Sequence, residues 1–191
     1  RGLEVVMVAP NTPESWIEAH TMRNGRIRFR RILEDAGVFD RIRFVHPEVR
    51  HDGEQVETMV HSKVMAVDDR WLRIGSANLN NRSMGTDTEC DLVIEASSDQ
   101  QRAAISELRN RLLGEHCGAS AQDVAELLED TGSILQVADI LSRNGHALRP
   151  IDDGELDTIE PAYIEAIADP SGPLSWRWLT EWRNGSLFSG H

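Results

Sequence analysis

The chain has 191 residues, 40% hydrophobic and 27% charged, a balance typical of a folded globular protein and not of a disordered or fibrous one. Its longest apolar runs are the length of a strand, well short of the roughly 20 residues that a membrane-spanning helix needs. The formal net charge of −12 disfavours general nucleic-acid binding, because counterion release requires a positive surface.

The negative charge is concentrated late in the chain. Residues 119–191 contain 4 Arg and 13 Asp or Glu, so they carry −9 of the total. The chain starts at Arg1 within a predicted strand, and we therefore expect it to be part of a longer protein. Cys90 and Cys117 are too few for a disulfide framework and lack metal-ligand spacing, which favours two core residues and a reducing compartment.

The first part of the chain predicts strands mixed with helices. A buried strand over residues 3–9 is followed by two helices, over 13–19 and 23–36, which Asn24-Gly25 should separate. Alternating apolar residues then predict strands over 41–45, 56–61, 63–67, 71–74 and 89–95, with turns at 51–53 and 68–69.

Helical periodicity takes over after residue 100. One helix is predicted over 102–116, and two more begin at Ser120 and Ser133 with capping-box spacing. Residues 152–173 are acidic and show little regular pattern apart from a short helix over 161–168. The end of the chain holds three tryptophans, which either pack against the sheet or anchor at a membrane interface: Trp176, Trp178 and Trp182.

These elements predict an α/β fold, a mixed β-sheet sandwiched by helices. We place a boundary near Gly118. Residues 1–118 are expected to form the sheet domain, and residues 119–191 an acidic, mostly helical C-terminal extension.

The side chains best suited to chemistry lie between residues 61 and 89. Lys63 is the single lysine among 20 basic residues, and it follows His61 by two positions, which on a strand puts imidazole and ammonium on one face. The next strand leads into residues 75–78, Gly-Ser-Ala-Asn, where a turn of small residues presents a hydroxyl and a carboxamide. These groups suit a phosphodiester, since the donors can hold its oxygens while the histidine attacks phosphorus or transfers a proton.

This stretch resembles the phospholipase D superfamily, whose signature is H-x-K-x4-D-x6-G-S-x-N, the HKD motif. Residues 77–83 also look like that family, and Glu89 matches its acidic residue on the following strand. The resemblance covers residues 1 to about 118 and, more loosely, a segment through Ser133 that is similar to the tail of bacterial phospholipase D or cardiolipin synthase-like proteins. Six residues match the signature without a gap: His61, Lys63, Asp68, Gly75, Ser76 and Asn78.

The resemblance implies two similar halves, each donating one motif to a shared site. One histidine forms a phosphohistidine and the other acts as general acid and base. This motif looks like the later one of a pair, so His61 is expected to be the acid/base, with Glu89 orienting its ring. Lys63 and Asn78 would bind phosphate with support from Ser76, and no metal or other cofactor is implied, because the two lysines of a complete site supply the charge. Structural or supporting roles fall to Asp68, Gly75 and Arg82.

Only one H-x-K motif occurs in the chain, so it would supply half of a site. The second half would come from a missing N-terminal half or from a homodimer mate. The implied function is a phosphodiesterase that acts on phospholipids by hydrolysis or transphosphatidylation, in the cytoplasm or at a membrane surface. The alternatives are a nuclease or other phosphodiesterase of the same superfamily, and a non-catalytic scaffold half.

Two further groups of residues have competing interpretations. Arg23, Arg26 and Arg30 share one helical face, which could meet anionic headgroups, although a face paired with carboxylates is the commoner arrangement. A metal cluster is rejected for the three histidines of this region, whose spacings fit no metal template: His46, His51 and His61.

Overall fold

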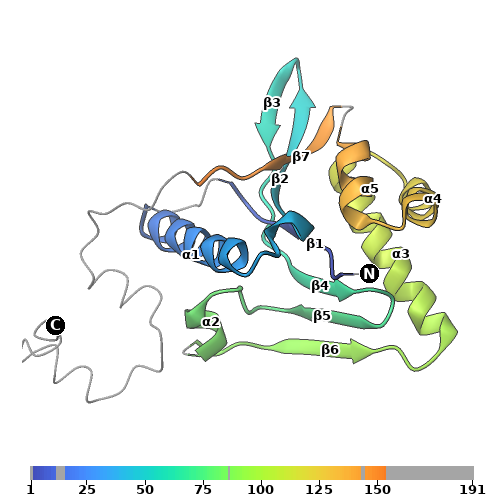
Figure 1. Ribbon diagram of the computed structural model, residues 1–191, viewed down its shortest axis with the longest axis horizontal. Helices are drawn as coiled ribbons and strands as arrows, with labels where there is room; N and C mark the ends of the chain where they lie inside the picture. The colour runs from blue at the N-terminus through green and yellow to red at the C-terminus, as the bar shows by residue number, and fades with distance from the viewer. Residues whose placement is uncertain (1, 12–15, 86, 143–144, 154–191) are drawn as a thin grey trace, which may run out of the picture.

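A computed structural model describes residues 2–11, 16–85, 87–142 and 145–153, without the side chains of residues 16–22, 24, 81 and 82. Within these residues the chain has the predicted α/β fold, with strands in two sheets (Figure 1). The elements are β1 (Val5–Val8), α1 (Trp16–Asp35), the 3₁₀ helix η1 (Phe39–Arg41), β2 (Ile42–His51), β3 (Glu54–Glu57), β4 (Lys63–Val67), β5 (Trp71–Gly75), α2 (Asn81–Gly85), β6 (Asp91–Glu95), α3 (Asp99–Cys117), α4 (Ala121–Thr131), α5 (Ile134–Leu141) and β7 (His146–Pro150).

The first sheet, here called the mixed sheet, consists of β1, β2, β3 and β7. Its long central strand β2 pairs in parallel with β1 and antiparallel with both β3 and β7. The hairpin from β2 to β3 turns at Asp52 and Gly53, both with positive φ, as the predicted turn over 51–53 requires. The second sheet, here called the motif sheet, is the antiparallel meander β4-β5-β6. The sequence predicts one sheet, and the structure divides these strands between two.

Helices cover both faces of the mixed sheet, which confirms the predicted sandwich (Figure 1). On one face Val45 lies in a buried cluster with residues of α3, α4, α5 and β7, among them Leu113, Val137 and Leu148. On the other face Phe44 packs edge-on against Phe29 of α1, with ring centroids 6.0 Å apart. Burying each large apolar side chain contributes about 1.5–3 kcal/mol, so these two layers hold the strands in place.

The ends of α3, α4 and α5 follow the predicted capping residues. Ser120 and Asp123 form a complete capping box at the start of α4, and the Ser133 hydroxyl accepts the Gln136 amide at the start of α5. Gly118 ends α3 with a left-handed φ of 65°, a conformation that glycine adopts without a steric penalty. The predicted boundary therefore coincides with a helix end. Beyond it α4, α5 and β7 pack into the same core as β2.

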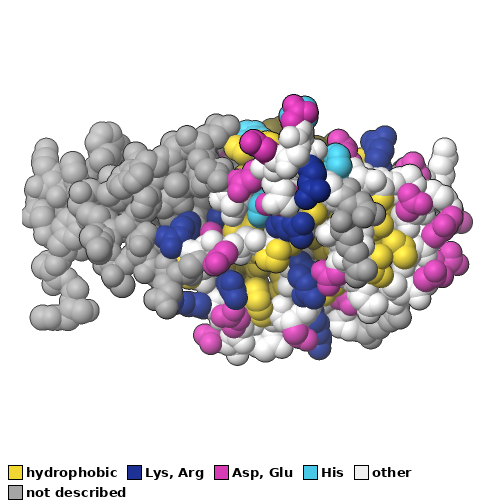
Figure 2. All heavy atoms as spheres, turned by 90° about the horizontal axis from the view of Figure 1, so that it is seen from above, with side chains coloured by type: hydrophobic (Ala, Val, Ile, Leu, Met, Phe, Trp, Pro, Cys, Tyr) yellow, Lys and Arg dark blue, Asp and Glu magenta, His cyan; other side chains and the backbone are white. Residues whose placement is uncertain are grey.

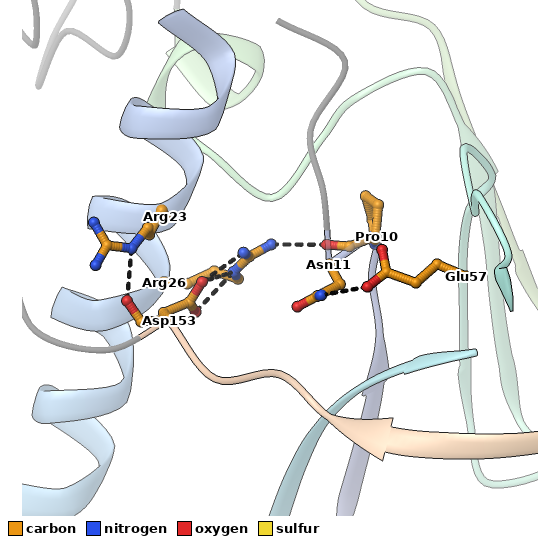
Figure 3. A network of polar contacts seen from close by, with 6 residues as sticks. All are labelled: Pro10, Asn11, Arg23, Arg26, Glu57 and Asp153. Carbon is orange, nitrogen blue, oxygen red and sulfur yellow. Dashed lines mark hydrogen bonds and ion pairs between the residues drawn. The ribbon is translucent and has the colours of Figure 1, made fainter. Parts of the chain in front are cut away.

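Helix α1 corrects one prediction, because it runs unbroken through Asn24-Gly25. The Arg23 Nε atom donates to the Asp153 carbonyl oxygen at 2.6 Å (Figure 3). Arg26 binds the Asp153 carboxylate with an Nη2–Oδ1 distance of 2.6 Å and donates to the Pro10 carbonyl oxygen at 3.0 Å (Figure 3). Anchors on both sides of Gly25 outweigh the roughly 1 kcal/mol that a glycine costs inside a helix.

The same contacts decide between the two interpretations of the arginine face. Arg23 and Arg26 bind Asp153, and Arg30 pairs with Glu34 at 2.8 Å. Two of the three arginines of this face, Arg26 and Arg30, are therefore paired with carboxylates in the folded chain, and Arg23 donates to a backbone carbonyl oxygen.

Two strands differ from their predicted bounds by more than two residues at one end. β2 continues six residues past residue 45, because β7 and β3 pair with its second half. β3 ends at Glu57, so the prediction of a strand over 56–61 was wrong and His61 lies in the connection before β4. The sequence analysis also missed α2 and β7.

The predictions for residues 154–191, including the helix over 161–168 and the three tryptophans, lie outside the described residues. Within the described part, no helix combines the length and apolar character that crossing a bilayer would require.

Candidate active site

The motif sheet brings the two parts of the sequence motif together. β4 and β5 pair antiparallel with Lys63 opposite Gly75, and β6 continues the row with Asp91 opposite Gly75. The H-x-K segment and the Gly-Ser-Ala-Asn turn therefore lie at the same end of the sheet.

Asp68 lies at the opposite end of the β4–β5 hairpin, in its turn. Its φ of 52° falls in the left-handed region, which Asp tolerates better than most residues. Its carbonyl oxygen accepts a hydrogen bond from Arg109 Nη1 of α3 at 3.0 Å. Burial lowers the pKa of the Arg109 guanidinium, and the charges of Asp68 and Asp69 oppose that shift. Asp68 thus fixes the turn and its contact with α3.

His61 and Lys63 are linked directly. His61 is exposed, Lys63 is half-buried, and the Lys63 ammonium donates to the His61 carbonyl oxygen at 2.8 Å. The ammonium group is thereby held beside the residue whose imidazole the sequence assigns to proton transfer.

Ser76 fastens the turn to the next strand. Its amide donates to the Cys90 carbonyl oxygen at 3.1 Å, and its hydroxyl oxygen accepts the Cys90 amide at 3.0 Å. The same hydroxyl donates to Glu89 Oε2. The described contact of the Glu89 carboxylate is therefore to Ser76, and its predicted contact with the His61 ring stays a prediction. Cys90 is exposed, which corrects its assignment to the core, whereas Cys117 is buried as predicted.

Two residues that the sequence analysis missed form an ion pair next to this turn, and one of them contacts its backbone. Arg73 Nη2 forms an ion pair with Asp91 Oδ1 at 2.9 Å and donates to the Ala77 carbonyl oxygen at 3.3 Å. Gly75 has no side chain at a point where an added methyl group would overlap the Asp91 carboxylate. Only the strand register brings these residues together, so the linear sequence offered little signal for them.

The turn continues into the short helix α2. Asn78 is half-buried, Ala77 is buried, and the Asn80 side chain accepts the amide of Ser83 at 2.8 Å. That contact fixes the chain just after Asn78. Arg82, a predicted supporting residue, has no described side chain.

An apolar surface adjoins the motif. α3 covers one face of the motif sheet through Leu72 and Ile105. The next row on that face, towards the motif, is Val64, Ile74 and Leu92, with exposed fractions of 37, 44 and 62%. The motif end of the sheet is therefore open on this side.

The described residues hold no group of three or more His, Cys, Asp or Glu side chains that could bind a metal ion. A cavity of about 290 Å³ lies away from the motif, between α1 and the mixed sheet, where it is lined by Arg26, Phe39 and Phe44.

The comparisons with known proteins agree with the motif. A family model described as "Cardiolipin synthase, PLD-like domain" matches residues 1–112. A phospholipase D of Phytophthora infestans is 38% identical over 78 residues, which are 35% of this chain and 4% of that protein. Phospholipase D zeta 1 of Arabidopsis thaliana is 35% identical over 85 residues, 38% of this chain and 8% of that protein. The chain thus matches less than a tenth of the length of either relative.

Proposed function

The chain belongs to the phospholipase D superfamily of phosphodiesterases, and on that basis we propose that it supplies one half of the active site of an enzyme that cleaves phospholipids. The observation that supports this most strongly is the strand register. With Lys63 opposite Gly75, the histidine and lysine of the motif lie at the same end of one sheet as its serine and asparagine.

In the proposed mechanism His61 is the general acid. The histidine of the second half attacks phosphorus, a P–N bond forms, the P–O bond to the leaving alcohol breaks, and His61 gives that oxygen its proton. His61 then takes a proton from water or from a second alcohol, which attacks phosphorus and releases the second histidine. Proton transfer of this kind contributes about 10²–10⁴-fold to a rate.

Lys63 and Asn78 are proposed to stabilise the negative oxygens during both steps. Lys63 is held close to His61 by its bond to the His61 carbonyl oxygen. Ser76 supports them by fixing the turn that carries Asn78, since its hydroxyl is bonded to Glu89 and Cys90. We retain Glu89 as the residue that orients His61, through Oε1, the carboxylate oxygen that Ser76 does not use.

A second half would complete the site. His61 is exposed, and the apolar side chains of Met65 and Val93, on the same face of the motif sheet as Lys63, are 53 and 57% exposed. We propose that this side meets a second HKD half, which is either another part of the natural polypeptide or a second copy of the chain. Residues 1–118 would provide the catalytic groups and residues 119–191 an acidic extension.

The charge distribution favours a lipid over a nucleic acid. The net charge is −12 and α4 carries four acidic and no basic residues. On the face drawn in Figure 2, acidic side chains gather over the end formed by α3–α5, with basic ones nearer the middle. A nuclease would need a continuous positive groove, so it is the second candidate.

The test is an assay of the natural polypeptide that contains this chain, on phosphatidylcholine, phosphatidylglycerol and plasmid DNA, with and without chelator. We expect lipid cleavage that the chelator leaves unchanged and that His61→Ala abolishes. His51→Ala serves as the matched control, because His51 is an exposed residue at the end of β2, in a different sheet from the motif. Activity that needs a metal, or that survives His61→Ala, contradicts the proposal. Cleavage of DNA alone supports the nuclease, and no cleavage of any substrate supports the scaffold.

A further inference from the structure

The Arg73–Asp91 ion pair lies outside the six signature residues, yet it is placed directly beneath the turn that carries Asn78. The exposed fractions of its two side chains are 20 and 25%. A second pair of an arginine with a carboxylate, Arg70–Glu95, joins the turn before β5 to the end of β6 and is far more exposed, at 56 and 45%. The Arg73 pair is therefore the better shielded from solvent, and its electrostatic interaction is correspondingly stronger.

The register puts this pair on the same face of the motif sheet as Lys63. Lys63, Gly75 and Asp91 form one row across the three strands, and Met65, Arg73 and Val93 form the next row on that face. Gly75 leaves a gap in the first row, and the Asp91 carboxylate fills it. The carboxylate therefore reaches over the central strand toward Arg73.

Arg73 also reaches the backbone of the turn. The nitrogen that pairs with Asp91 is 3.3 Å from the Ala77 carbonyl oxygen, and Ala77 precedes Asn78. On its other side the turn is held by the bonds of Ser76 to Glu89 and Cys90. The turn is thus fastened at two points, through Ser76 to the residues just before β6 and through Arg73 to Asp91 of β6.

We propose that Arg73 and Asp91 are positioning residues, which hold the turn so that the Asn78 amide and the Lys63 ammonium meet the same phosphate group. The proposal rests on the proposed function for the identity of the anion, but not for the geometry of the turn.

The test compares Arg73→Met and Asp91→Asn with Arg70→Met, the matched control in the turn before β5, in the 191-residue chain. The first measurement is amide hydrogen exchange of residues 76–78, which needs no ligand. We expect exchange about tenfold faster in either Arg73→Met or Asp91→Asn, as the loss of one charged hydrogen-bonded contact implies, and unchanged in Arg70→Met. The double variant Arg73→Met/Asp91→Asn should exchange these amides no faster than either single variant, because both substitutions remove the same interaction.

Arg73→Lys guards against variants that fail to fold. Lysine keeps a positive charge for Asp91, but its side chain is one atom shorter than that of arginine, which places its nitrogen farther from the Ala77 carbonyl oxygen. We therefore expect a native thermal midpoint together with fast exchange at residues 76–78. The dissociation constant for inorganic phosphate should rise in parallel with exchange. Wild-type exchange in Arg73→Met and Asp91→Asn, or equal acceleration in Arg70→Met, would overturn the inference. A wild-type polypeptide that cleaves no phosphodiester would refute the proposed function alone.

Discussion

The hydroxyl of Ser76 donates to Glu89 Oε2 across 2.5 Å, and its oxygen accepts the amide of Cys90. One small side chain thereby joins the end of β5 to the start of β6. Because Asn78 follows two residues later, these bonds fix the start of the turn that carries the asparagine. Glu89 gains a structural partner in the turn in addition to the role that the resemblance assigns to it.

Ser76→Ala should therefore lower activity, because it loosens the turn that carries Asn78. Removing the hydroxyl breaks the bonds to Glu89 and Cys90, and we expect kcat/KM for phosphodiester cleavage to fall about 10- to 100-fold. The free energy of unfolding should fall by only about 1 kcal/mol, because these bonds are exposed. Steady-state kinetics and urea unfolding measure the two effects. Ser62→Ala, which removes an exposed hydroxyl inside the motif, is the control, and an equal loss of activity there would argue against this explanation.

Lys63→Arg should be poorly tolerated although it keeps the positive charge. The ammonium is half-buried and bonded to the His61 carbonyl oxygen, and a guanidinium is larger and planar. We expect at least about a 100-fold loss in kcat, comparable to the loss of one transition-state donor, with a smaller change in KM. A variant with wild-type kcat would show that charge alone is required at residue 63.

Asp153→Asn should destabilise the fold while leaving the residues of the HKD motif unchanged. The side chains of Arg26 and Asp153 are only 14 and 16% exposed, so the change leaves a largely buried guanidinium without its countercharge. We expect the free energy of unfolding to fall by about 2–3 kcal/mol. Glu34→Gln, which breaks the exposed pair with Arg30, should cost no more than about 0.5 kcal/mol. Equal losses for the two variants in urea unfolding would contradict this ranking.

His116 should make stability depend on pH. Burial lowers the pKa of its imidazole below the ordinary 6.5, and the neighbouring Glu115 opposes that shift only in part. Between the lowered pKa and 6.5 the unfolded chain binds more protons than the folded one. Stability from this group is therefore complete above about pH 6.5 and is lost as the pH falls below it.

His116→Asn should accordingly make the free energy of unfolding depend less on pH below 6.5. Urea unfolding at pH 7.5, 6.5 and 5.5 measures this dependence, and between pH 6.5 and 5.5 the wild type should lose more stability than the variant does. Between pH 7.5 and 6.5 the two proteins should behave alike. Identical slopes at low pH would mean that other groups cause the decline.

The sequence was most informative where a pattern is local. The hairpin of β4 and β5, the turn at Asp68 and the cap residues Ser120 and Ser133 could all be predicted, because each depends on neighbours a few positions away. β7 could not, since its five residues are strand only through pairing with β2, about 100 positions earlier in the chain. The unbroken α1 likewise depends on Asp153, and no periodicity near Asn24-Gly25 could indicate so distant an anchor.

The candidate site divides in the same way. His61, Lys63 and Asn78 could be proposed from their spacing in one segment of 18 residues. Arg73 and Asp91 were missed, because opposite charges 18 positions apart become neighbours only in one particular register.

The central claim is that His61, Lys63 and Asn78 converge on one phosphate group, and side-chain NMR of the chain during a titration with inorganic phosphate tests it most directly. The account predicts that the His61 imidazole, the Lys63 ammonium and the Asn78 amide all shift with a single dissociation constant. It also predicts that Lys63→Met abolishes all three responses. Phosphate that shifts Lys63 alone, or that binds equally well to Lys63→Met, would contradict it.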